Sequence, residues 1–207
     1  MINPLVLASA SPRRHELLSY LELPFVIDPS TVDEPSHSAP TPSALAGILA
    51  RAKAADVAAR HGCAVVIGAD TLVDLDGQVL NKPRDREDAV RMLSLLTGRT
   101  HRVHTGIAVV RGNVRLSEVV TAGVTLRAAS LAQIEAYVAT GEPLDKAGAY
   151  AAQGLGAALV ERVEGSYLCV VGLPLLALRA LLREIGIESA APLPLLERLE
   201  RGTNPDR

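Results

Sequence analysis

Aromatic residues are nearly absent from this chain. Its 207 residues include no tryptophan, one phenylalanine (Phe25) and four tyrosines. Hydrophobic residues nevertheless make up 48% of the sequence, so the core must be built from Leu, Val, Ile and Ala. A chain of this length can bury a sizeable core, as one large domain or two small ones. A tryptophan stacking platform for a ligand is excluded.

Cysteine and long hydrophobic runs are also scarce. The two cysteines, Cys63 and Cys169, stand far apart without CxxC or metal-ligand spacing. Both lie in apolar, strand-like runs, so we expect buried thiols in a cytoplasmic protein. No run of about 18 apolar residues is present, and we expect no transmembrane helix. The apolar stretch near the N-terminus has no charged segment before it, which argues against a signal peptide.

No charge of either sign dominates the sequence. The formal net charge is −2, whereas a general nucleic-acid binder usually carries a basic excess. We therefore expect neither a nucleic-acid nor a membrane partner. The basic residues in the motifs below are interpreted as a local site on a mildly acidic protein.

The order of apolar runs and turn signals predicts an α/β fold. Because hairpins alternate with helices, the sheet should be mixed and twisted, with flanking helices and two lobes around a cleft. We expect a single domain over residues 1–187 and a flexible tail over 188–207. Strands are expected near residues 5–7, 23–27 and 64–69, and in pairs around Asp76-Gly77, Gly112-Asn113 and Glu164-Gly165. Helices are expected to begin near residues 12, 42, 85, 130 and 174.

The segment LASASPRR, which ends at Arg14, predicts an anion site. A short apolar run leads into a turn and a helix, with Ser11 as N-cap and Pro12 in the first turn. Backbone N–H groups, hydroxyls and guanidiniums would meet at this helix N-terminus, which favours a bound phosphate. The alternative is an ordinary capped helix with solvated arginines, and the segment alone does not decide between them.

Two acidic residues are candidates for water activation or metal binding. Asp70 directly follows a buried run, at the kind of strand end where α/β proteins bind ligands. It could act as a general base or bind Mg²⁺, or it could merely cap the following turn. Glu34 lies in a polar loop, where it could join a metal shell or remain solvated.

Two lysines stand at unusual places. Lys53 lies at the edge of the apolar stripe of its predicted helix, so it could reach into a cleft or extend to solvent. Lys82 lies beside Pro83 in a constrained loop and suits a point contact to a phosphate. Solvated loop lysines are more common, so this residue alone decides nothing.

Residues 144–156 hold three glycines around Gln153. Glycine lets a backbone approach a ligand closely. A Gln amide offers a donor and an acceptor side by side, which match the edge of uracil or thymine. A Gly-rich loop is also typical of a plain turn, so both interpretations stay open.

Taken together, these segments resemble the Maf, or septum formation inhibitor-like, family of nucleoside triphosphate pyrophosphatases. The resemblance extends from about Leu5 to Ile185. Each segment alone is ambiguous, but their occurrence together and in one order is specific. The segments are LASASPRR, VDE, ARAKA, GADT, NKPRD, TGRTHRVHTGIAV, LDKAGAYAAQGLG and GSY…VVGLPL.

The resemblance implies a fold similar to that of the inosine triphosphatases. It also implies hydrolysis between the α- and β-phosphates of a nucleoside triphosphate, which yields a monophosphate and pyrophosphate. Asp70 would be the proton acceptor that activates water, and Glu34 would join it in holding a divalent cation, Mg²⁺ or Mn²⁺. The residues implied to bind the triphosphate are Ser9, Arg14, Lys53 and Lys82.

Three residues resemble the branch of the family that hydrolyses dTTP and UTP: Arg13, Thr71 and Gln153. The branch that acts on 7-methyl-GTP tends to carry tryptophan, glutamine and glutamate at the matching positions. We therefore expect pyrimidine nucleotides as substrates and leave modified pyrimidines open. A 7-methyl-GTP pyrophosphatase, a non-catalytic nucleotide-binding regulator of septum formation and a homodimer also stay open. Cys169 departs from the pattern, because many relatives carry a polar residue there, often Asn.

Overall fold

The structure is a computed structural model that describes residues 5–202. Its strands are β1 (Leu5–Leu7), β2 (Phe25–Ile27), β3 (Val65–Leu75), β4 (Gln78–Leu80), β5 (Thr100–Arg111), β6 (Val114–Leu126) and β7 (Val160–Glu164). They form one seven-stranded sheet in the order β2-β1-β3-β5-β6-β7, with β4 paired to β3. β1 is parallel to both of its neighbours and the other pairs are antiparallel, so the sheet is mixed as predicted.

Helices flank this sheet on both faces. The α-helices are α1 (Pro12–Ser19), α2 (Pro42–Ala58), α3 (Arg86–Leu96), α4 (Leu131–Ala139), α5 (Tyr167–Val171), α6 (Leu175–Glu184) and α7 (Leu193–Glu200). The 3₁₀ segments are η1 (Glu34–Ser36), η2 (Glu142–Asp145), η3 (Ala147–Ala149) and η4 (Gly154–Leu159). Among the residues described, no helix is both long enough and apolar enough to cross a membrane.

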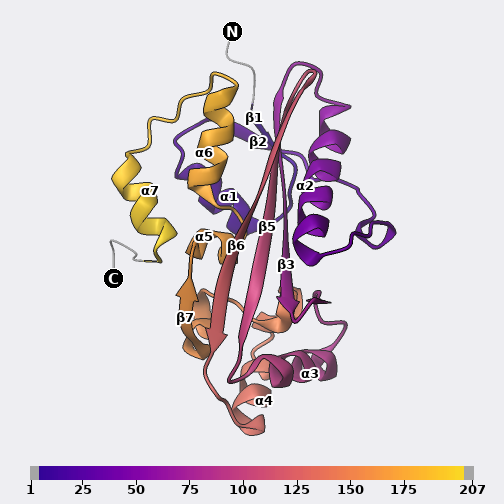
Figure 1. Cartoon of the computed structure of the whole chain (residues 1–207), viewed down its shortest axis with the longest axis vertical. Helices are drawn as coiled ribbons and strands as arrows, with labels where there is room; N and C mark the ends of the chain where they lie inside the picture. The colour runs from indigo at the N-terminus through magenta and orange to yellow at the C-terminus, as the bar shows by residue number, and fades with distance from the viewer. Residues whose placement is uncertain (1–4, 203–207) are drawn as a thin grey trace.

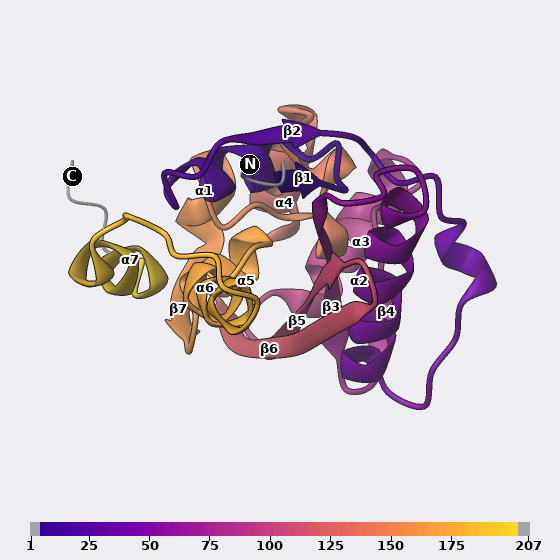
Figure 2. The ribbon, with the colours of Figure 1, turned by 90° about the horizontal axis from the view of Figure 1, so that it is seen from above.

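The long strands β3, β5 and β6 connect two separately packed ends of the molecule (Figure 1). At one end, Ile67 of β3 packs with α1, α5, α6 and α7, while Val66 faces the opposite side and packs against α2. This alternation follows from the two-residue period of a strand, and Figure 2 shows α2 on the far side of the sheet from α1 and α6. At the other end, Val73 and Leu75 pack against α3 and α4. The expected two lobes are these two ends.

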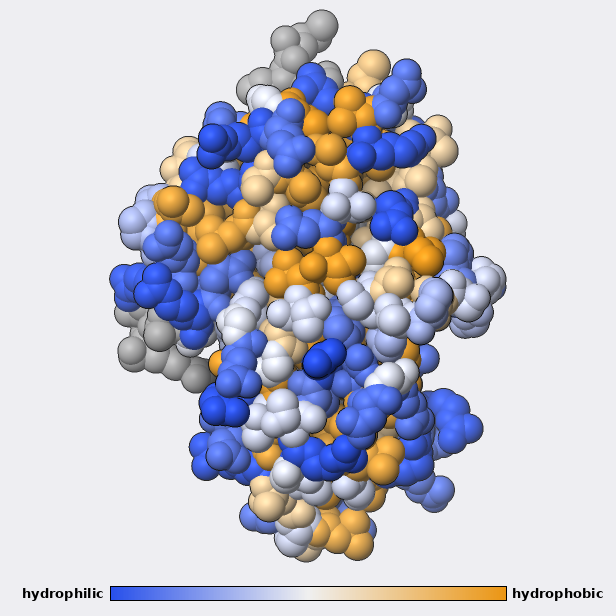
Figure 3. All heavy atoms as spheres, in the orientation of Figure 1, coloured by the Kyte–Doolittle hydropathy of each residue, from blue (hydrophilic) through white to orange (hydrophobic). Residues whose placement is uncertain are grey.

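Polar and hydrophobic residues are unevenly distributed over the face of the molecule that Figure 3 shows. Charged and polar side chains cover most of it, and hydrophobic ones lie mainly in the upper half (Figure 3). Scattered hydrophobic residues of this kind are normal on a globular surface.

Asp70 lies in the middle of a strand, whereas the sequence predicted it at a strand end. The ladder between β3 and β5 continues without a break from Val65 to Asp74, which carries the strand past Asp70. On the other edge of β3, pairing with β1 stops at Ile67, and pairing with β4 begins at Val73. Residues 68–72 therefore have no ladder partner on that edge within the described chain. This gap in the sheet edge leaves Asp70 without a neighbouring strand on that side.

Two glycines bring helix α2 close to the sheet. A Cβ at Gly68 would lie 2.4 Å from the Ala50 carbonyl oxygen, and one at Gly106 would lie 2.2 Å from that of Ala46. Gly106 is the register partner of Asp70. Because only glycine permits so close an approach, these residues set the distance between α2 and β3. That distance brings Lys53 of α2 to Asp70.

Two other local expectations are wrong. The predicted strand pair around Gly165 is one strand, β7, followed by helix α5, because the hydroxyl of Ser166 accepts a hydrogen bond from the Cys169 backbone N–H and caps a helix. Cys63 is exposed in the turn after α2, whereas Cys169 is buried as predicted.

The segment expected to be a flexible tail contains helix α7. Leu196 is fully buried in the same core as α6, and the Glu200 carboxylate accepts hydrogen bonds from the Leu176 backbone N–H and the Ser166 hydroxyl. The prolines of this segment suggested a loose chain, but Pro192 and Pro194 lie at the N-cap and in the first turn, where proline is favoured. The rest of the expected tail, residues 203–207, lies outside the described residues.

The packing of α2 predicts that Gly68→Ala lowers the free energy of unfolding by about 1–3 kcal/mol, because the helix backbone has to move away from the sheet. Gly62→Ala is the control, since a Cβ at Gly62 meets nothing within 4 Å. That variant should change the free energy by less than about 0.5 kcal/mol. Urea denaturation measures both, and equal stability of the two variants would contradict the close approach of α2.

Candidate active site

A cavity of about 560 Å³ opens at the gap in the edge of β3. Its walls come from the start of α1, the η1 loop, α2, β3, the loop after β4 and residues 145–153. The predicted site residue Ser9 is buried beside it and bonded to Arg14. The other eight line the cavity: Arg13, Arg14, Glu34, Lys53, Asp70, Thr71, Lys82 and Gln153.

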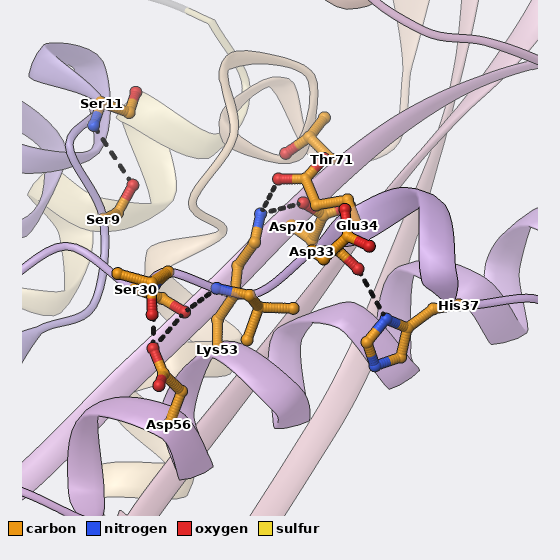
Figure 4. A network of polar contacts seen from close by, with 12 residues as sticks. Ser9, Ser11, Ser30, Asp33, Glu34, His37, Lys53, Asp56, Asp70 and Thr71 are labelled. Carbon is orange, nitrogen blue, oxygen red and sulfur yellow. Dashed lines mark hydrogen bonds and ion pairs between the residues drawn. The ribbon is translucent and has the colours of Figure 1, made fainter.

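Lys53 joins the two predicted acidic residues. Its Nζ donates hydrogen bonds to Asp70 Oδ1 and Glu34 Oε1, each at 2.6 Å (Figure 4). The Lys53 side chain is only 12% exposed, so it reaches into the cavity instead of extending to solvent. Three residues far apart in the sequence thus form one charged cluster around a buried carboxylate.

The Asp70 carboxyl group is buried and incompletely hydrogen-bonded. Burial raises its pKa above the ordinary value, although the positive charges of Lys53 and Arg14 oppose this rise. Its Oδ2 atom is buried and has no hydrogen-bond partner in the described structure. A buried acceptor left without a donor costs about 1–3 kcal/mol, so this oxygen is suited to receive a proton or to contact a cation.

The donors available to a cation are the carboxylates of Glu34 and Asp70. Burial raises the pKa of Glu34, but the hydrogen bond and charge of Lys53 more than offset this, and the pKa lies below its usual value. The described residues contain no cluster of three or more His, Cys, Asp or Glu that could hold a metal ion. Mg²⁺ usually binds one or two carboxylates together with substrate phosphates, so this pair of carboxylates fits such an ion.

Arg14 is held by three uncharged acceptors. Its Nε donates to the Gly172 carbonyl at 2.9 Å, one Nη to Ser9 Oγ at 3.3 Å and the other to Thr71 Oγ1 at 3.0 Å. Burial lowers the pKa of Arg14 and the Asp70 carboxylate raises it, but a guanidinium stays charged in proteins. These contacts fix its orientation and leave part of its donor fork for an anion. Ser11 caps α1 as predicted.

The hydroxyl of Thr71 belongs to a chain of hydrogen bonds in which donor and acceptor are fixed at each link. Thr105 Oγ1 donates its single proton to the Cys169 carbonyl at 2.7 Å. Thr71 must therefore be the donor in its 2.9 Å hydrogen bond to Thr105 Oγ1. Thr71 then faces Arg14 as an acceptor and has no proton left for a ligand. Its contact with Arg14 is a support for the guanidinium.

The remaining three predicted residues lie on other walls of the cavity. Arg13 is half-buried beside Arg14, and Lys82 is exposed in the loop after β4. Gln153 is half-buried on the segment that follows Tyr150. The site therefore has a cationic side near α1 and a neutral amide on residues 145–153.

Sequence reasoning missed two supports of this site, Thr105 and the Gly172 carbonyl. Thr105 is fully buried on β5 as the register partner of Thr71, and Gly172 ends helix α5 at a φ of 123°. A threonine in a long apolar strand gives little signal of function. A glycine just before a proline-led helix is typical of any helix end.

Comparison with known proteins identifies the family of this chain. The family model described as Maf-like protein matches residues 4–185. The chain belongs to the Maf family. Its curated relatives include the dTTP/UTP pyrophosphatases of Moorella thermoacetica (54% identical over 190 residues, 90% of this chain and 97% of the relative) and Myxococcus xanthus (50% over 190 residues, 92% and 94%). The dTTP/UTP pyrophosphatase of Yersinia pestis is 48% identical over 182 residues, 87% of this chain and 92% of the relative.

One solved structure shows a weak likeness to this Maf family member. It is a nucleoside triphosphatase, a dITP/XTP pyrophosphatase, from Mycobacterium abscessus. The two chains are 15% identical with a TM-score of 0.39, over 59% of this chain and 74% of the other. A likeness at this level does not bear on the fold, so similarity to inosine triphosphatase folds stays a prediction.

The raised pKa of Asp70 predicts that Asp70→Asn stabilises the fold at neutral pH. A carboxyl whose pKa is higher in the folded than in the unfolded chain stabilises the fold at acidic pH, and this stabilisation is lost as the pH rises through the folded pKa. The variant avoids that loss, so its free energy of unfolding should exceed that of the parent at pH 7. The gain should disappear as the pH falls below the ordinary pKa of an aspartate. Urea denaturation at several pH values measures it.

Asp28 provides a control of opposite sign. Hydrogen bonds from Arg60 and His61 lower its pKa to about 2. Asp28→Asn should therefore destabilise the fold at pH 7, and this effect should fade as the pH approaches 2. If both variants lose stability at pH 7, the assignment of a raised pKa to Asp70 is wrong.

Proposed function

We propose that this protein hydrolyses dTTP and UTP between the α- and β-phosphates, giving a nucleoside monophosphate and pyrophosphate. The observation that carries the proposal is the buried Asp70 carboxylate, held by Lys53 in a cavity that also presents Arg14 and Lys82. The family and the names of relatives at 48–54% identity support the same reaction.

The cationic side of the cavity suits a triphosphate. Phosphoryl transfer depends mainly on positioning and on cations that face the developing negative charge, and less on a covalent nucleophile. Arg14 is already oriented by Ser9, Thr71 and the Gly172 carbonyl, so its remaining donors can bind phosphate oxygens without a loss of side-chain entropy. Lys82, exposed in the loop after β4, can contact the phosphates that lie farther from the nucleoside.

Asp70 is the proton acceptor for the attacking water in this proposal. Oδ1 is engaged by Lys53, so Oδ2, which has no partner in the described structure, is the atom that receives the proton. A raised pKa makes the carboxylate a better base than an ordinary aspartate. Lys53 opposes the effect of burial and so favours the ionised form that this role needs.

We further propose that Glu34 and Asp70 hold a divalent cation, Mg²⁺ or Mn²⁺. When bound, such an ion would polarise the phosphate oxygens and offset their charge. Lys53 contacts both carboxylates, so the two proposed ligands lie close to each other.

The wall of the cavity that carries Gln153 suits a pyrimidine base. The Gln153 amide offers one donor and one acceptor, which match the N3–H and a carbonyl oxygen of uracil or thymine. Arg13, next to Arg14, lines the same cavity, and its resemblance to the dTTP/UTP branch supports the same substrates. These residues support dTTP and UTP over a purine substrate.

Pyrophosphate release from a nucleotide panel tests the reaction. With Mg²⁺ or Mn²⁺, dTTP and UTP should be hydrolysed, whereas GTP and 7-methyl-GTP should react slowly. Asp70→Asn should lower kcat by about 10²–10⁴-fold, because the proton acceptor and one carboxylate ligand of the proposed cation are lost together. Nucleotide affinity should stay similar, since the cationic residues that face the phosphates are unchanged. Asp76→Asn, in the exposed turn between β3 and β4, should behave like the parent chain.

Three outcomes would overturn this proposal. Full activity of Asp70→Asn removes its role as the base. Hydrolysis of 7-methyl-GTP faster than that of dTTP and UTP would place the chain in the 7-methyl-GTP branch of the family. Nucleotide binding without pyrophosphate release, whatever the metal, favours a non-catalytic regulator.

Base recognition is tested by Gln153→Glu. A carboxylate accepts but does not donate, so kcat/KM for UTP should fall by about tenfold. The ratio of kcat/KM for UTP to that for GTP should fall as well. Gln78→Glu adds the same charge at an exposed position of β4 and serves as the control. An unchanged UTP preference in Gln153→Glu would show that the amide does not contact the base.

A further inference from the structure

The three glycines near Gln153 make room for protein atoms. A Cβ at Gly154, which has a φ of +67°, would lie 2.3 Å from Glu142 Oε1. A Cβ at Gly156 would lie 2.4 Å from the Tyr137 hydroxyl, and one at Gly148 would lie 3.0 Å from the Val73 side chain. The glycine pattern that suggested close approach of a ligand is therefore explained by close approach of Glu142, Tyr137 and Val73.

Glu142 and Tyr137 hold the backbone on both sides of Gln153. Glu142 Oε1 accepts the Leu155 N–H at 3.0 Å, and Oε2 accepts the Gly156 N–H at 2.8 Å. Oε2 also accepts the Tyr137 hydroxyl proton at 2.7 Å, and the Tyr137 oxygen accepts the Ala151 N–H at 3.1 Å. The backbone is thus fixed two residues before Gln153 and two and three residues after it. We call these two side chains the Tyr137–Glu142 pair.

The protonation of the pair favours this arrangement. Burial and the nearby Glu142 carboxylate raise the pKa of Tyr137, so the phenol keeps its proton. Burial raises the pKa of Glu142, but the hydrogen bonds from Tyr137, Gly156 and Leu155 more than offset it and keep the pKa below its ordinary value. Hydrogen bonds to an ionised carboxylate are shorter and stronger than those between neutral groups.

The pair lies away from the reacting phosphates. Tyr137 is on α4 and Glu142 begins η2, both in the lobe opposite the one that contains Lys53 and α2. Neither side chain lines the cavity. Their effect on a ligand must therefore pass through the segment that carries Gln153.

We propose that Tyr137 and Glu142 are positioning residues for base recognition, which fix the Gln153 amide in the cavity and so set the preference for uracil and thymine. This inference rests on the proposed function of the cavity. Loosening the pair should weaken recognition of the base and leave the chemistry at Asp70 largely intact.

Glu142→Gln tests the inference with almost no change in volume. The amide NH₂ cannot accept, so one backbone N–H of residues 155–156 loses its partner and the segment is no longer held at that point. KM for UTP should rise on the order of tenfold with kcat changed by less than about twofold, and the ratio of kcat/KM for UTP to that for GTP should fall. Glu135→Gln, on the exposed face of α4, should leave all of these values unchanged.

Tyr137→Phe provides a second test that removes a single hydroxyl. It should shift the UTP preference in the same direction, because the Ala151 N–H loses its acceptor. The double variant should change the UTP preference by less than the product of the two single effects, since the pair acts as one unit. If Glu142→Gln does not fold, Tyr137→Phe alone tests the inference, through the ratio of kcat/KM for UTP to that for GTP.

Binding measurements separate this inference from the proposed reaction. Calorimetric Kd values for α,β-imido-UTP and α,β-imido-GTP, whose α–β linkage is not hydrolysed, report base preference without turnover. A parent chain that prefers the uridine analogue and variants that lose this preference support the inference, even if the parent releases no pyrophosphate. Variants that keep the parent preference, or that lose affinity for both analogues equally, overturn it.

Discussion

The close approach of helix α2 to strand β3 is the constraint on which the site depends. Gly68 and Gly106 place no side-chain atoms of their own against the helix backbone, so α2 lies close to the sheet and Lys53 comes within 2.6 Å of Asp70. A buried carboxylate is tolerated when a hydrogen-bonded cation accompanies it, and Lys53 is that cation. The same strand lacks a ladder partner over residues 68–72, which gives the pair access to the cavity. The packing of α2 against the sheet therefore also determines the geometry of the site.

In its proposed role as the proton acceptor, Asp70 shows a conflict between stability and function. Its pKa is raised and its Oδ2 has no partner in the described structure, so the ionised group lowers the stability of the fold. Such unfavourable groups persist where activity needs them and the surrounding packing compensates for their cost. The compensation here lies in the apolar contacts of β3 on both faces, against α2 and against α1 and α6.

Local signals in the sequence predicted local structure well. Ser11 caps α1 as expected, and the helix expected near residue 130 begins there with Ser130 as its N-cap, because a cap depends on a few neighbouring residues. Features that depend on distant residues were not predictable. β3 continues past Asp70 because β5 pairs with it, and α7 packs because its leucines meet a core formed by the N-terminal half. The nine predicted site residues do converge, but the supports behind two of them could not be recognised as such. Thr105 lies in the segment TGRTHRVHTGIAV, where nothing marks it as the partner of Thr71, and Glu142 lies outside the segments that carry the resemblance.

Each side of the cavity is held by a short chain of hydrogen bonds. Each chain ends at a backbone carbonyl or a carboxylate, which can only accept, and this decides which group donates at every other link. On the cationic side the chain runs from Arg14 through Thr71 and Thr105 to the Cys169 carbonyl. That chain ends on a main-chain oxygen, which is present whichever side chain residue 169 carries. The thiol instead donates to the Val120 carbonyl, and burial raises its pKa to about 11, which keeps it protonated. The orientation of Arg14 therefore depends on the backbone carbonyl of residue 169, which cysteine supplies as any other residue would.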